Sequence, residues 1–147
     1  MAPMSARDPL DAWHETTLRV RYEETDRMGV VYHGKYFEYF EVGRTEWLRS
    51  RGLAYRDLEA RGHGLAVVDV VAKYKAPARY DDLLTIRTSC TGFGKASVDF
   101  SYEVRREDGG LLAVGTTRLA SIGPEGRPRR LPAELIALAS QAEGGAR

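Results

Sequence analysis

Cysteine is nearly absent from this sequence, because Cys90 is the only one among 147 residues, and no disulfide can form within the chain. No stretch reaches the roughly 18 consecutive apolar residues that mark a membrane-spanning helix. The opening residues also lack the apolar core of a secretory signal peptide. These shortages predict a cytoplasmic protein that does not span a membrane.

The chain also carries almost no net charge. The formal net charge is +1, so we expect no general attraction to nucleic acid. The three histidines, His14, His33 and His63, are not spaced as metal ligands, so we expect no metal. The chain contains no Gly-x-Ser-x-Gly elbow and no glycine pattern for nucleotide phosphates. We therefore expect no cofactor.

The length of the chain is that of one domain with one hydrophobic core. Residues 1–14 contain prolines and scattered charges without a period, which predicts a flexible leader. We expect a single domain over residues 15–141, closing with a short helix at Ala133–Gln141. Residues 142–147 are predicted to be a flexible tail.

Hydrophobic periodicity predicts the elements of this domain. A buried helix is expected from Gly34 to Ser50, with Gly52 as its C-terminal cap, because its aromatic residues leave only one narrow polar stripe. A short helical turn is expected at Tyr55–Arg61. Alternating or valine-rich segments predict five strands, at Thr17–Tyr22, Leu65–Ala76, Leu83–Cys90, Lys95–Arg105 and Leu111–Ile122.

The order of the elements predicts the fold. Four consecutive strands with short turns favour an antiparallel sheet, and one apolar helix can cover one of its faces. We therefore predict an α+β protein with a five-stranded antiparallel sheet wrapped around one long central helix, the hotdog fold. In the valine-rich strand, Val67 or Val68 and Val70 or Val71 must point away from the helix, which predicts an oligomer. Cys90 is expected to be a buried small hydrophobe.

The loop between the first strand and the helix contains Asp26 in the stretch Thr25-Asp26-Arg27-Met28-Gly29. It leads into a helix N-terminus, whose unpaired N–H groups suit the oxygen of a polarised carbonyl. A nearby carboxylate can activate water or attack directly. From spacing alone, Asp26 can equally be the cap of a helical turn at residues 27–32.

The residues around Asp26 resemble the active-site signature of the 4-hydroxybenzoyl-CoA thioesterase family. That signature is carried by Arg19-Val20, Thr25-Asp26, Gly29-Val30-Val31, Gly34 and Tyr36. The resemblance covers roughly residues 17–135 and includes Tyr74-Lys75-Ala76-Pro77. The Tyr32-His33 pair makes the chain similar to the bacterial short-chain acyl-CoA thioesterase branch associated with the Tol–Pal system, whereas the branch acting on 4-hydroxybenzoyl-CoA commonly has tyrosine and proline at positions 33 and 34.

The resemblance implies an acyl-CoA thioesterase. Asp26 would be its catalytic carboxylate, and a backbone N–H near His33 would hold the thioester oxygen, with the role of the His33 ring left open. Substrate-binding positions would be Gly29, Val30, Tyr32, Tyr36 and Lys95, the last of these toward the nucleotide of CoA. Relatives imply a homotetramer built as a dimer of dimers.

Two other functions remain open at this stage. The first is a hydratase or dehydratase acting on an acyl thioester with His33 and Asp26, and the second is a non-catalytic acyl-CoA-binding protein. The sequence does not fix the acyl group or whether Asp26 acts as a nucleophile or as a general base.

Overall fold

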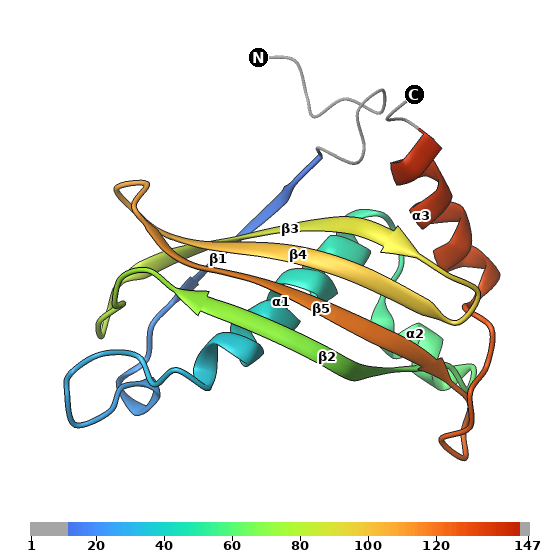
Figure 1. The fold of residues 1–147 in the computed structure, drawn as a ribbon, viewed down its shortest axis with the longest axis horizontal. Helices are drawn as coiled ribbons and strands as arrows, with labels where there is room; N and C mark the ends of the chain where they lie inside the picture. The colour runs from blue at the N-terminus through green and yellow to red at the C-terminus, as the bar shows by residue number, and fades with distance from the viewer. Residues whose placement is uncertain (1–11, 145–147) are drawn as a thin grey trace.

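The computed structural model describes residues 12–144 and the side chains of residues 12–138; the predicted leader and tail lie largely outside them. The elements follow in the order β1 (His14–Arg19), η1 (Tyr22–Glu24), α1 (Lys35–Ser50), α2 (Tyr55–Ala60), β2 (Gly64–Tyr74), β3 (Leu83–Phe93), β4 (Ser97–Arg106), β5 (Leu111–Ile122) and α3 (Ala133–Gly144). The strands form one five-stranded sheet in the order β1-β3-β4-β5-β2, and every pairing is antiparallel. Helix α1 lies across one face of this sheet (Figure 1). The predicted α+β hotdog architecture is confirmed.

Helix α1 is held by aromatic packing on its sheet-facing side. The Phe40 ring stacks on Tyr102 at 4.5 Å between centroids, and Trp47 meets Phe100 edge-on at 5.4 Å. Such pairs add about 0.5–1.5 kcal/mol to the burial of their area. A Cβ at Gly43 would lie 2.3 Å from Thr88 Oγ1, so this glycine lets the helix approach the sheet. The opposite side of α1 leaves Phe37 and Val42 exposed.

Helix α1 ends at Ser50, and Gly52 terminates it, both as predicted. Gly52 has φ +84°, a conformation that glycine adopts without cost. Its N–H donates to Arg49 O, and the Leu53 N–H donates to Leu48 O, both at 3.0 Å. These two bonds form the Schellman motif, which satisfies the last carbonyls of the helix.

The prediction for the first strand was wrong at both ends. Strand β1 pairs with β3 from His14 to Arg19, and Tyr22, expected on the buried face, is 77% exposed. The chain leaves the sheet after Arg19 and enters η1, where the Glu24 carboxylate accepts hydrogen bonds from the Arg21 N–H and from Arg21 Nε. The later strands match the expected segments closely, and β5 has the predicted bounds.

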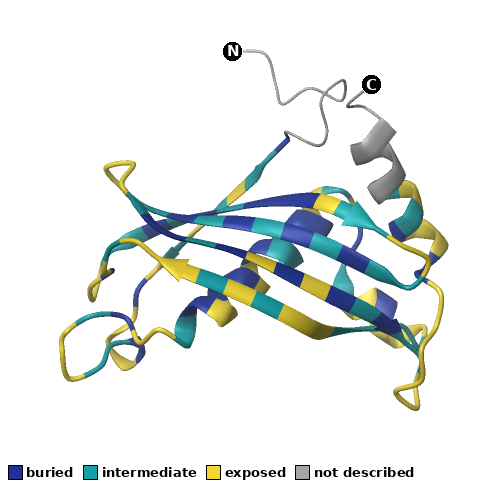
Figure 2. Cartoon of the chain, viewed as in Figure 1, coloured by how far each residue is buried: buried dark blue, intermediate teal, exposed yellow. Residues whose placement is uncertain are grey.

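Strand β2 is an outer strand of the sheet and contains a β-bulge between Val67 and Asp69. Exposed residues follow one another along it (Figure 2). Val68 and Val71 are 58% and 43% exposed. Val67 is 46% exposed as well, but it lines, together with Val70, a groove whose other wall is α1. The expectation that one valine of each pair points away from the helix is therefore confirmed.

The remaining expectations concern the ends and the single cysteine. Helix α3 begins at Ala133 as predicted and continues to Gly144, three residues beyond the expected end at Gln141. Cys90 is buried, as expected. Among the described residues, no helix is long and apolar enough to cross a membrane.

Candidate active site

Asp26 lies in a tight turn between η1 and α1. Its N–H donates to Val30 O and its carbonyl accepts from the Gly29 N–H, both at 2.9 Å. Gly29 has φ +78°, which favours glycine at this position. The segment 27–32 forms no helix, so Asp26 does not cap one.

The carboxylate of Asp26 has one local partner. Oδ1 accepts a hydrogen bond of 2.9 Å from the Met28 N–H, which makes an Asx turn. Within the described part of the chain, Oδ2 accepts no hydrogen bond. The turn therefore orients the carboxyl group through one oxygen and leaves the other available to a ligand.

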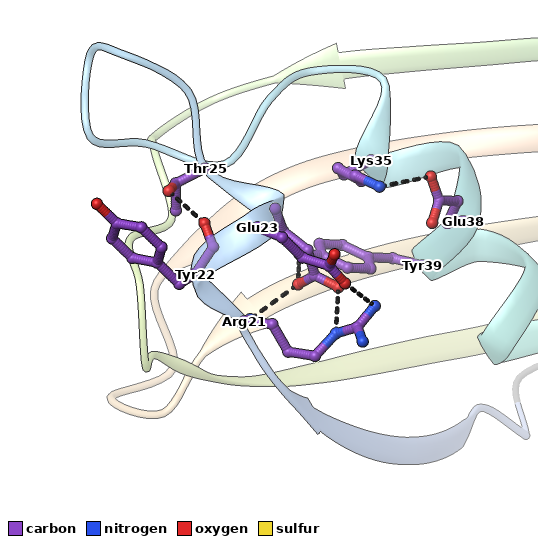
Figure 3. A network of polar contacts seen from close by, with 8 residues as sticks. Arg21, Tyr22, Glu23, Thr25, Lys35, Glu38 and Tyr39 are labelled. Carbon is purple, nitrogen blue, oxygen red and sulfur yellow. Dashed lines mark hydrogen bonds and ion pairs between the residues drawn. The ribbon is translucent and has the colours of Figure 1, made fainter.

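The loop that holds Asp26 is fastened to α1 through a buried carboxylate, Glu24. Its Oε1 accepts from the Arg21 N–H at 3.0 Å and from the Tyr39 hydroxyl at 2.9 Å, while Oε2 pairs with Arg21 Nε at 3.3 Å (Figure 3). Burial alone would raise the pKa of the Glu24 carboxyl, but these donors outweigh it and hold the pKa below its usual range. The ionised carboxylate thus links the loop to the helix.

The head of α1 presents two backbone donors. The N–H groups of His33 and Gly34 donate no hydrogen bond within the described residues, because the first bonds of this turn run from Lys35 N to Tyr32 O and from Tyr36 N to His33 O. Unpaired N–H groups at a helix N-terminus, together with the helix dipole, favour a negatively charged oxygen. The His33 carbonyl also accepts a 2.7 Å hydrogen bond from the Tyr74 hydroxyl of β2.

The Tyr32 ring lies over Gly34. A Cβ at Gly34 would stand 2.9 Å from Tyr32 Cε2. The Tyr32 ring also lies against the His33 ring, with 4.3 Å between centroids. Any larger residue at position 34 would push the Tyr32 ring away from the head of α1.

These groups meet at an open pocket of about 360 Å³. The loop and the helix contribute Asp26, Val30, Val31, His33 and Tyr36, and the end of β2 and the turn after it contribute Tyr74, Lys75, Ala76 and Pro77. Burial raises the pKa of the Tyr36 phenol, so this group stays a neutral hydrogen-bonding hydroxyl. A mostly apolar pocket with a carboxylate and free N–H groups suits an acyl group whose carbonyl is to be attacked.

Four of the predicted site residues line this pocket: Asp26, Val30, His33 and Tyr36. Gly29 and Tyr32 shape the loop beside it. Lys95 lies in the turn between β3 and β4, at the end of the sheet opposite the loop (Figure 1). Within one chain it is therefore not brought to Asp26, and its contact with the nucleotide stays a prediction. The lysine that lines the pocket is Lys75.

Sequence reasoning missed Glu24 and Tyr74. No capping-box signature marked Glu24, because that motif begins with serine or threonine and this chain has Arg21 there. Tyr74 offered no local signal, since its partner His33 is 41 residues away. No group of three or more His, Cys, Asp or Glu residues among those described is placed to hold a metal ion.

Comparisons with known proteins identify the family of the chain. A family model described as the thioesterase superfamily matches residues 28–113. The acyl-CoA thioester hydrolase YbgC of Escherichia coli O6:H1 is 35% identical over 121 residues, covering 82% of this chain and 90% of the relative. The acyl-CoA thioesterase YbgC of Haemophilus influenzae is 32% identical over 114 residues, covering 77% of this chain and 83% of the relative.

Among solved structures, the DHNA-CoA thioesterase from Staphylococcus aureus superposes with a TM-score of 0.87 at 30% identity, covering 90% of this chain and 91% of that one. Sequence and fold similarity therefore extend over most of the described residues. The chain belongs to the thioesterase superfamily.

Proposed function

We propose that this protein hydrolyses an acyl-CoA thioester to the free acid and CoA. The observation that carries the proposal is that Asp26 and His33 line one pocket, and that the His33 N–H at the head of α1 donates no hydrogen bond to any of the residues that the structure describes. The names of the relatives from Escherichia coli and Haemophilus influenzae support the same reaction. The roles proposed below for individual residues rest on the geometry of the pocket and on the family signature.

In the proposed reaction, the thioester oxygen accepts hydrogen bonds from the backbone N–H groups at the head of α1. Attack on the carbonyl carbon places negative charge on that oxygen, where the donors and the helix dipole stabilise it. The C–S bond then breaks and CoA leaves as the thiolate, which takes up a proton. One such donor is typically worth a factor of about 10²–10³ in rate.

Asp26 activates the attack in one of two ways. As a general base it takes a proton from water, which is typically worth about 10²–10⁴ in rate. As a nucleophile it forms a mixed anhydride that water then opens. A single turnover in ¹⁸O-labelled water tests the nucleophilic route, because label in the Asp26 carboxyl marks an anhydride that water has opened at the Asp26 carbonyl. Trapping the acyl-enzyme by rapid acid quench and mass spectrometry tests an anhydride that water opens at the acyl carbonyl.

The central test is Asp26→Asn, measured as thiol release from a panel of aromatic, short and longer acyl-CoA substrates. Asparagine keeps an oxygen for the Met28 N–H, so the turn should remain intact. We expect kcat to fall by about 10²–10⁴ with folding unchanged. Asp108→Asn is the matched control, because Asp108 Oδ1 makes the same kind of bond to the Gly110 N–H in the β4–β5 hairpin.

Each outcome of this test has a meaning. Wild-type turnover by Asp26→Asn would exclude the mechanism above. A change in acyl unsaturation without thiol release would indicate a hydratase or dehydratase, and acyl-CoA binding without either reaction would indicate a binding protein. The panel also identifies the preferred acyl group.

We further propose that the protein acts as a homotetramer, a dimer of dimers. Exposed apolar residues on outer strand β2, with Val68 at 58%, and on the free side of α1, with Phe37, support burial against another copy. The cytoplasmic location remains a prediction.

A further inference from the structure

We propose that two copies of this chain pack together through α1, with Glu41 of each copy paired to Arg44 of the other across a two-fold axis. The proposal rests on the homotetramer that the proposed function includes, and it names the contacts of one interface. The observation behind it is a pair of opposite charges on α1 that stays apart within the chain, in a groove with apolar walls.

Helix α1 carries three pairs of opposite charges, each three residues apart: Lys35 and Glu38, Glu41 and Arg44, and Glu46 and Arg49. The first pair forms an ion pair within the helix, with 3.2 Å between Lys35 Nζ and Glu38 Oε2 (Figure 3), and so does the last pair. The middle pair has the same spacing, which normally allows contact on a helix. Yet neither of its charges forms an ion pair with any residue in the described part of the chain. Both charges are therefore available to a second molecule.

Arg44 is held in place from the side of the sheet. Its side chain is half-buried, and its guanidinium donates a hydrogen bond to the Tyr102 hydroxyl, which lies 2.6 Å from Thr117 Oγ1. A guanidinium has five N–H donors, so this contact orients the group and leaves donors for a carboxylate. A charge that is partly removed from water and has no counter-ion destabilises a protein, and a carboxylate from outside the chain would relieve that cost.

Glu41 and Arg44 line an open groove of about 260 Å³ between α1 and β2. Phe37 contributes an apolar side chain from α1, and Val67 and Val70 contribute theirs from β2. Phe37 and Val67 are 43% and 46% exposed. Exposed apolar side chains gathered around a few polar groups are typical of a protein–protein interface.

The groove fits a second copy of the chain because its charges are complementary to themselves. In a two-fold interface, residue i of one copy contacts residue j of the other, and j contacts i. An axis that crosses α1 near Val42, which is 37% exposed, places Glu41 opposite Arg44 twice. Because Val67 and Val70 lie across the groove from this pair, the same axis passes near the middle of β2, whose outer edge can then pair antiparallel with its own copy.

The test exchanges the two charges between separate copies. Glu41→Arg and Arg44→Glu each place like charges opposite one another twice in the interface. Each variant alone should therefore fall to half the wild-type subunit number, at protein concentrations about 100-fold above those at which the wild type dissociates. An equimolar mixture of the two variants should restore the wild-type assembly, because each introduced charge then faces an opposite charge on the other variant. Mass photometry over a dilution series measures the subunit number, and rescue by mixing cannot arise from a contact within one chain.

Arg49→Glu is the matched control. It reverses an exposed charge on the same helix, but the partner of Arg49 is Glu46 of the same chain, and Arg49 does not line the groove. It should keep the wild-type subunit number. Urea unfolding shows whether each variant is folded. If Arg44→Glu does not fold, because Arg44 contacts the buried Tyr102, the dissociation of Glu41→Arg at its exposed position decides the test.

The outcomes separate this inference from the thioesterase activity. Dissociation of each variant followed by reassembly on mixing supports the proposal. A wild-type subunit number in Glu41→Arg, dissociation that mixing of the folded variants does not reverse, or equal dissociation of Arg49→Glu would each overturn it. A monomeric wild-type protein would overturn it together with the proposed tetramer, whereas thiol release from acyl-CoA, measured separately, decides the thioesterase.

Discussion

Replacing Glu24 with glutamine should destabilise the protein, whereas the same change at its neighbour Glu23 should not. Glu24 is 7% exposed, and three donor groups from Arg21 and Tyr39 surround its carboxylate. Glu23 also pairs with Arg21, at 2.9 Å, but both side chains of that pair are about two-thirds exposed. The two variants remove the same charge from adjacent positions and differ in burial and partners.

The expected magnitude follows from the contacts. Glutamine keeps one oxygen for the Arg21 N–H and the Tyr39 hydroxyl, but these bonds lose their charge assistance, and the amide nitrogen meets Arg21 Nε as a second donor. Hydrogen bonds to charged groups contribute about 1.5–3 kcal/mol and neutral ones about 1 kcal/mol. We therefore expect Glu24→Gln to lower the free energy of unfolding by about 2 kcal/mol, and Glu23→Gln by less than about 0.5 kcal/mol.

The assay is urea unfolding of both variants and the wild type, repeated across acidic pH. In thermal unfolding, a loss of about 2 kcal/mol in a chain of this size corresponds to a fall in Tm of about 4–8 °C. Because the pKa of the Glu24 carboxyl in the folded state lies below its ordinary value of 4.5, the contribution of Glu24 to stability is complete above that pH. The stability gap between wild type and Glu24→Gln should then narrow as the pH falls through the folded pKa.

Two results would refute this reasoning. Equal losses for Glu23→Gln and Glu24→Gln would mean that burial and the Tyr39 bond do not matter. A gap that stays constant into strong acid would mean that the ionised form of Glu24 is not the one that the fold stabilises.

Two further changes test the packing and the assembly. Gly115→Ala should lower the free energy of unfolding in urea by at least about 1–3 kcal/mol, because its Cβ would lie 2.3 Å from Phe40 Cζ and 2.7 Å from the Val71 carbonyl oxygen. Gly92→Ala should lower it less, because the nearest atom to its Cβ lies at 3.9 Å. Equal losses of stability in the two variants would contradict the argument from these contacts. Val68→Asp should reduce the number of subunits measured by light scattering, because a charge on β2 would be buried without a partner in the interface. Thr91→Asp, at an exposed position on β3, should leave that number unchanged. A tetramer that persists in Val68→Asp would show that this part of β2 is not an interface.

Much of the fold was predictable because it depends on short-range rules. The period of its apolar residues located α1, and the left-handed conformation open to glycine located its end at Gly52. Strict alternation located β4, and β5 was found with its observed bounds. The position of Asp26 in a loop before a helix was also readable, since both neighbours of the loop had clear periods.

Short-range rules failed where a local bond or a bulge interrupts the pattern. Alternation extended the first strand to Tyr22, but the hydrogen bonds that Arg21 donates to the Glu24 carboxylate hold the chain in the turn η1, outside the sheet. The bulge in β2 likewise changes the side on which every later residue lies, including Tyr74.

The sequence by itself determined the elements, their order, the hotdog architecture and, through its signature, the candidate carboxylate Asp26. Only the tertiary structure decided that β2 lies at an outer edge, that Glu24 reaches Tyr39, that Tyr74 reaches the His33 carbonyl, and that Lys95 lies at the far end of the sheet. The physical reason is that periodicity records which side of an element is buried, whereas contacts between distant segments depend on strand order, register and bulges, which no local pattern records.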